Sequence, residues 1–132
     1  MNKLNFISYT LAIFIILTNY GFSDDVKVII DLPAKFQDSG FQIAFPHIGT
    51  AWGATLNHVH TQTIPVPPYQ DLQGIMIRRT QVGKEDVISC TPESFSYKEN
   101  LTVELKYDNS ANNYGKSAFK FHDGLYCTVT GN

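Results

Sequence analysis

The residues with the clearest potential for chemistry are two histidines, His58 and His60, which are separated by Val59. Side chains two residues apart in a β-strand point in the same direction, so both imidazoles can reach one metal ion. Imidazole nitrogen suits zinc, copper and nickel. A complete site needs three or four ligands, and His47 or His122 supplies one only if the fold brings it close. The pair therefore predicts a copper or zinc site.

Two other interpretations of this histidine pair stay open. Both side chains can be exposed on a polar edge strand without any ligand. They can also act as a pH sensor, since histidine changes charge near neutral pH. No partner carboxylate for such a sensor is evident in the sequence.

Cys90 and Cys127 are the only two cysteines, so they allow a single disulfide connectivity. Their spacing is far too long for the Cys-x-x-Cys arrangement that tunes a reactive thiol. Free thiols or a redox pair are the alternatives. An exported chain favours a structural disulfide, because its destination is oxidising.

A catalytic constellation is not recognisable. Serines, histidines and aspartates are present, but none lies in a Gly-x-Ser-x-Gly elbow. A pair of carboxylates chosen from twelve acidic residues would be arbitrary. We therefore expect a protein that is not an enzyme and has no cofactor beyond a copper or zinc ion, with a small hydrolase as a third hypothesis.

Aromatic residues are plentiful, with nine Phe, seven Tyr and one Trp, and most of them should fill the core. Tyr69, Tyr97 and Tyr114 lie in or near expected loops. Amphipathic rings favour interfaces, so these three are candidate contacts for a protein or glycan partner.

Two further polar motifs have simple interpretations. Arg78 and Arg79 are neighbours in an expected strand, so they face opposite ways and form no single patch. We expect them to be solvated charges at a sheet edge. Asn100, followed by Leu101 and Thr102, fits the N-glycosylation sequon, which matters only in a eukaryotic host.

Residues 1–23 have the pattern of a secretory signal peptide. Phe6–Leu17 is an apolar run of twelve, and the small residues Gly21 and Ser23 suit cleavage before Asp24. A retained membrane anchor is the alternative, but a spanning helix needs about 20 apolar residues. The pattern predicts a secreted or periplasmic protein.

Cleavage leaves a single domain over residues 24–132, which is long enough for one core. Lys3 leaves with the signal peptide, so nine basic and twelve acidic side chains give a charge of −3. This balance argues against a nucleic-acid binder, which would need a basic face. No second long apolar run remains, so we expect no membrane span.

The elements that must position these residues are short strands. About eight alternating or apolar segments are separated by turn formers, and no convincing helix is present. An antiparallel two-sheet β-sandwich is the expected fold, with a small closed β-barrel as the alternative. The expected strands are Val26–Asp31, Phe41–Phe45, Ala54–Ile64, Gly74–Val82, Asp86–Cys90, Leu101–Asp108, Lys116–His122 and Leu125–Thr130.

Together these patterns predict an exported, disulfide-stabilised β-sandwich that works by binding. It would serve as an adaptor, an inhibitor or a subunit of an envelope or extracellular assembly. This expectation depends on the absence of catalytic features and on a rigid scaffold with loops. The alternative is a secreted or periplasmic metal-binding protein that uses His58 and His60.

Overall fold

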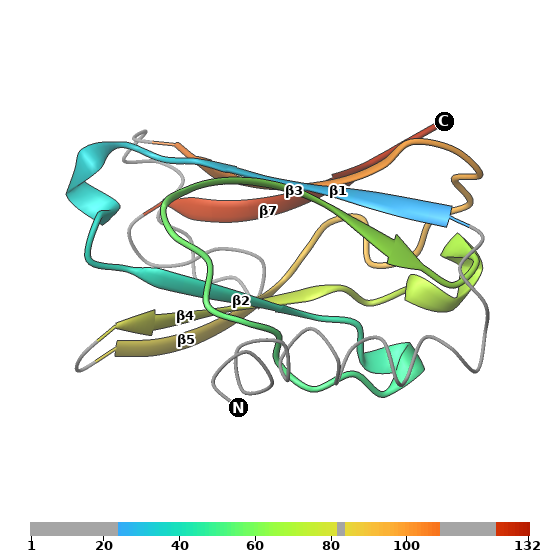
Figure 1. Cartoon of the computed structure of the whole chain (residues 1–132), viewed down its shortest axis with the longest axis horizontal. Helices are drawn as coiled ribbons and strands as arrows, with labels where there is room; N and C mark the ends of the chain where they lie inside the picture. The colour runs from blue at the N-terminus through green and yellow to red at the C-terminus, as the bar shows by residue number, and fades with distance from the viewer. Residues whose placement is uncertain (1–23, 82–83, 109–123) are drawn as a thin grey trace, which may run out of the picture.

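The structure, a computed structural model, describes residues 24–81, 84–108 and 124–132. Seven strands in these residues form two layers (Figure 1). One sheet, in the order β3-β1-β6-β7, contains β1 (Asp24–Asp31), β3 (Val59–Val66), β6 (Leu101–Tyr107) and β7 (Leu125–Thr130). The other, in the order β2-β4-β5, contains β2 (Gly40–Ala44), β4 (Met76–Gln81) and β5 (Lys84–Ser89).

The predicted all-β fold is confirmed as a two-sheet sandwich. The alternative of a closed barrel is wrong, because each sheet ends in edge strands, β3 and β7 in one and β2 and β5 in the other. One pairing departs from a purely antiparallel arrangement, since β1 and β6 run parallel. Regular helix is limited to the short 3-10 segments η1 (Ala34–Phe36), η2 (Pro46–Ile48) and η3 (Tyr69–Leu72) in the part of the chain that is described.

The core lies between the sheets and follows the period-two alternation of the strands. In β1, Val26, Val28 and Ile30 are buried, while the residues between them face outward. In β6, Leu101 and Val103 repeat the pattern. The predicted faces of both strands are therefore confirmed.

Both long sides of the sandwich are closed by chain that passes from one sheet to the other. On one side, Leu56 exchanges two backbone hydrogen bonds with Phe41 of β2, at 2.9 and 2.7 Å, before the chain enters β3. On the other side, the chain leaves β5 and Thr91 pairs with the backbone of β7. Two of the four edge strands are thus covered by these crossings.

The disulfide links the two layers at the second crossing. Cys90 directly follows β5, and Cys127 lies within β7, 37 residues further along the chain. Both sulfur-bearing side chains are buried. The predicted bridge is confirmed, and it is consistent with an oxidising environment.

Some sequence predictions differ from the structure or lie outside it. The strand expected over Asp86–Cys90 begins two residues earlier, at Lys84, because Lys84 and Glu85 pair with β4. The predicted strand Lys116–His122 and the signal peptide over residues 1–23 fall outside the described residues. In the described part of the chain, no helix is long and apolar enough to cross a membrane.

Candidate functional site

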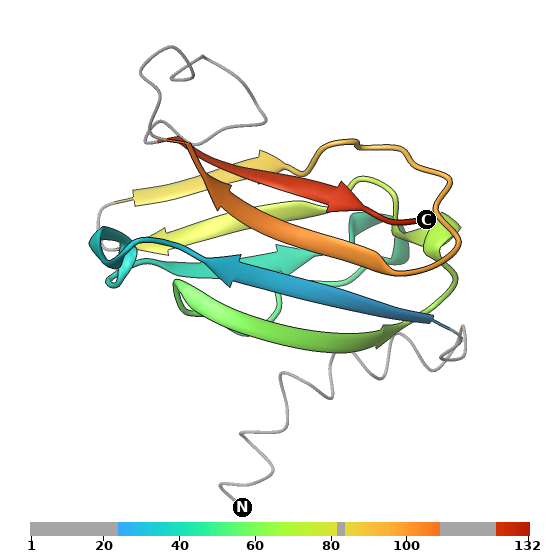
Figure 2. The same ribbon diagram turned by 90° about the horizontal axis from the view of Figure 1, so that it is seen from above.

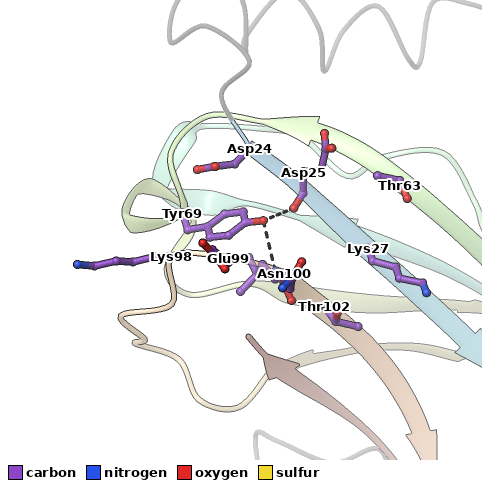
Figure 3. A pocket seen from close by; sticks show the side chains of 10 residues that line it. Asp24, Asp25, Lys27, Thr63, Tyr69, Lys98, Glu99, Asn100 and Thr102 are labelled. Atoms are coloured by element: carbon purple, nitrogen blue, oxygen red, sulfur yellow. Dashed lines mark hydrogen bonds between the residues drawn. The ribbon is translucent and has the colours of Figure 1, made fainter. Parts of the chain in front are cut away.

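A polar groove of about 450 Å³ lies at the end of the four-stranded sheet where β1 and β6 begin and β3 ends (Figure 3). Its walls combine these three strands with η3 and the loop that precedes β6. The lining residues are Asp24, Asp25, Lys27, Thr63, Tyr69, Lys98, Glu99, Asn100, Leu101 and Thr102.

Tyr69 connects the elements that form the groove. This residue of η3 is only 5% exposed, at the end of the sandwich. Its hydroxyl donates a hydrogen bond to the backbone carbonyl of Asp25 and accepts one, at 3.3 Å, from the backbone N–H of Leu101. One side chain therefore joins η3 to the adjacent strands β1 and β6, which fixes the walls relative to one another.

The floor of the groove is a row of three side chains on the outer face of the sheet. Lys27 in β1 pairs in register with Thr63 of β3 on one side and with Thr102 of β6 on the other. Directly opposed residues in neighbouring strands have their side chains on the same face. An ammonium group is thus flanked by two hydroxyl groups on a rigid sheet.

The rim of the groove adds charges of both signs. Asp24, Asp25 and Glu99 supply carboxylates, and Lys98 supplies a second ammonium group, which extends away from Tyr69 in Figure 3. The exposed Asn100 adds an amide in a backbone conformation with φ of 55°, which asparagine tolerates better than most residues. The groove therefore offers many hydrogen-bond donors and acceptors beside its apolar surface.

The histidine pair lies elsewhere, at the start of β3. His58 precedes the strand, and its carbonyl accepts a hydrogen bond of 2.9 Å from the N–H of Leu32. His60 lies within β3, where its Nε2 is 2.9 Å from Oε1 of Gln62. No group of three potential metal-ligating His, Cys, Asp or Glu side chains occurs among the residues described, and His122 is not one of these residues. A copper or zinc site at His58 and His60 stays a prediction.

The three candidate contact tyrosines have separate positions. Tyr69 is a core residue, so only the part of its side chain that lines the groove is accessible to a ligand. Tyr97 is half-buried and stacks on Phe95, with ring centroids 5.4 Å apart. Tyr114 lies outside the described residues. Their role as contacts stays a prediction.

The two neighbouring arginines do face opposite ways, but neither is a solvated edge charge. They lie in β4, the central strand of its sheet. Arg78, on the outer face, stacks its guanidinium over Trp52 at 4.7 Å and donates to Oε1 of Gln42 at 2.6 Å. Arg79 is 2% exposed and forms an ion pair of 2.8 Å with Asp86 of β5. The expectation of solvated charges is wrong because the strand lies inside the sheet and not at its edge.

Comparison with protein families, with curated proteins and with solved structures found no match for this chain.

Sequence reasoning did not find the groove. Lys27, Thr63 and Thr102 are ordinary outward residues of three strands that are distant in sequence. The sequence shows that they are polar, but they become neighbours only through the strand order β3-β1-β6 and its register.

Proposed function

We propose that this protein is an exported, non-catalytic binding module and that its ligand surface is the polar groove between β1, β3 and β6. The observation that carries the proposal is the groove itself, whose floor of Lys27, Thr63 and Thr102 is built on three neighbouring strands. Sites on rigid elements hold their side chains ready for a ligand and lose little entropy on binding. Export is supported by the signal-peptide pattern and by the Cys90–Cys127 disulfide.

The chemistry of the lining favours a ligand rich in hydroxyl groups, a glycan. The volume of about 450 Å³ is within the usual range for a ligand site of about 300–1,000 Å³. Most small-molecule pockets are largely apolar, but this one presents carboxylates, ammonium groups, hydroxyls and an amide. Such groups donate to and accept from sugar hydroxyls, whereas an apolar ligand would leave them unsatisfied.

A glycan array probed with the purified protein tests this proposal. Lys27 is exposed in the middle of the floor, so K27A should weaken binding to the captured glycan at least tenfold, about 1.4 kcal/mol. K106A is the matched control, because Lys106 occupies an outward position of β6 on the same sheet but does not line the groove. The proposal is wrong if no glycan is retained, or if K106A loses as much affinity as K27A.

A further inference from the structure

The four edge strands of the sandwich differ in whether other parts of the chain cover their outer backbone groups. The crossing at Leu56 covers the edge of β2, and Thr91 covers the edge of β7. Among the described residues, no strand pairs with the outer edge of β3 or of β5. Figure 2 shows β3, in green, along the free side of the four-stranded sheet.

The two uncovered edges differ in the residues that protect them. Natural edge strands avoid pairing with other chains through charged side chains, prolines or bulges. The sequence of β5 begins with Lys84, Glu85 and Asp86. Over Val59–Ile64, β3 has no Asp, Glu, Lys or Arg. Among the strands described, only β3 therefore combines a free edge with a segment that has no charged side chain.

The register of β1 and β3 determines which backbone groups of β3 point away from the sheet. The N–H of Leu32 donates to the carbonyl of His58, so this pair is a hydrogen-bonded one. Hydrogen-bonded and non-hydrogen-bonded pairs alternate along an antiparallel ladder. The even-numbered residues of β3 thus bond to β1, while Val59, Thr61 and Thr63 direct their N–H and C=O groups outward. Pro65 is the next outward position, where its missing N–H costs no bond to β1.

We propose that β3 pairs antiparallel with β3 of a second copy of this chain, about a two-fold axis at Thr61. In this register Thr61 opposes Thr61 of the second copy, and Val59 opposes its Thr63. All three outward residues then exchange both hydrogen bonds with their counterparts, and Pro65 lies beyond the paired segment. This interface goes beyond the proposed function, since it does not depend on a ligand in the groove.

The side chains in this register suit pairing with an identical strand. Val59, Thr61 and Thr63 are β-branched residues that favour strands, and all three are exposed on the outer face. Val59 is 58% exposed, which makes it one of two large hydrophobic side chains so exposed in the described part of the chain. No like charges face each other across the two-fold axis, so the strand is complementary to itself. An interface between two identical strands about a two-fold axis requires this self-complementarity, whereas binding of an unrelated peptide does not require it.

A charge-swap experiment tests the pairing at Thr61. Sedimentation equilibrium of the purified wild-type protein, up to about 1 mM, should show a monomer–dimer equilibrium. T61K and T61E should each weaken self-association at least tenfold, because each variant opposes its own charge at the axis. Mixing T61K with T61E should restore a dimer, since opposite charges then face each other. T130K is the matched control, because Thr130 is an exposed residue at the same sheet's other edge strand, β7.

Amide hydrogen exchange supplies a second readout that does not depend on the variants. The N–H groups of Val59, Thr61 and Thr63 should become more protected as the wild-type concentration rises, and those of T61K should not. A wild-type protein that stays monomeric overturns the proposal. This holds even if the edge of β3 then proves to bind a peptide of another protein. The proposal is also overturned by a T61K dimer as strong as wild type, a mixture of T61K and T61E that stays monomeric, or an equal loss in T130K. Thr61 does not line the groove, so glycan binding by these variants reports on the groove separately.

Discussion

At the scale of single residues, Arg79 has the least expected environment. It takes the inward position that follows Ile75, just before β4, and Ile77, within β4, both of which are buried and apolar. The ion pair with Asp86 is formed directly across the β4–β5 ladder. A buried guanidinium is tolerated where a carboxylate partner offsets its loss of hydration.

We predict that D86N destabilises the protein more than R79M does. Asparagine keeps the shape of Asp86 but removes the negative charge that pairs with the buried Arg79 at 2.8 Å, at a cost of about 1–3 kcal/mol. Methionine removes the cation altogether, and the Asp86 side chain, 34% exposed, stays hydrated, so the loss should stay below about 1 kcal/mol. Urea unfolding of both variants gives the comparison, and an R79M loss equal to or above that of D86N would contradict it.

The disulfide is the second residue-scale feature with a measurable contribution. Closing a loop of 37 residues restricts the unfolded chain and should stabilise the fold by about 4 kcal/mol in the simple entropic model. We predict that the double variant C90S/C127S, which leaves no lone thiol, loses about this amount. The free energy of unfolding of the double variant under oxidising conditions should equal that of the wild-type protein measured after its disulfide has been reduced. An unchanged unfolding midpoint in the double variant would show that the bridge contributes nothing.

At the scale of elements, the junction of β6 and β7 depends on one glycine. Gly124 has a φ of 88°, and the N–H of Asp108 donates to its carbonyl at 3.0 Å. A Cβ atom at this position would lie 2.2 Å from the carbonyl oxygen of Asp108. This close approach of two backbones is possible only without a side chain.

We predict that G124A is more destabilising than G49A. Gly49 also has a positive φ, 73°, but a Cβ there meets nothing within 4 Å. G49A should therefore cost only the left-handed backbone conformation, about 1 kcal/mol. G124A adds a clash between the new Cβ atom and the backbone of Asp108, which cannot rotate away as a side chain could. This clash should raise the loss of stability by about 1–3 kcal/mol more. Thermal unfolding of the two variants measures the difference, and equal midpoints would argue that the β6–β7 junction relaxes freely.

Strand β3 illustrates how far an element can be predicted. Neither face of the segment 54–64 is clearly apolar, which is typical of an edge strand or of a strand that carries something other than core, and β3 lies at the edge of its sheet. The start of the strand was predicted five residues too early, at Ala54 and not at Val59. Of the residues before it, Leu56 pairs with Phe41 of β2 in the other sheet, and His58 lies in a bend. Local pattern detects an extended backbone, whereas its pairing partner depends on the packing of the two layers.

At the scale of the whole molecule, the sandwich is closed by chain crossings on both sides. Leu56 pairs with β2 and Thr91 with β7, and the disulfide lies at the second crossing. These crossings leave the groove at one end of the sandwich and the edge of β3 along one side. A dimer through β3 would place both grooves on one continuous outer face, because opposed residues keep their side chains on the same face.

By itself, the sequence determined the all-β class, the inward faces of the main strands and the single disulfide. Alternation of apolar residues has a period that only a strand satisfies, and two cysteines allow only one bridge. The tertiary structure decided the rest: the parallel pairing of β1 with β6, the burial of Arg79, the groove around Lys27 and the uncharged outer edge of β3. These features depend on which strands become neighbours and in what register. That choice is made by the packing of the whole core, and no local stretch of sequence encodes it.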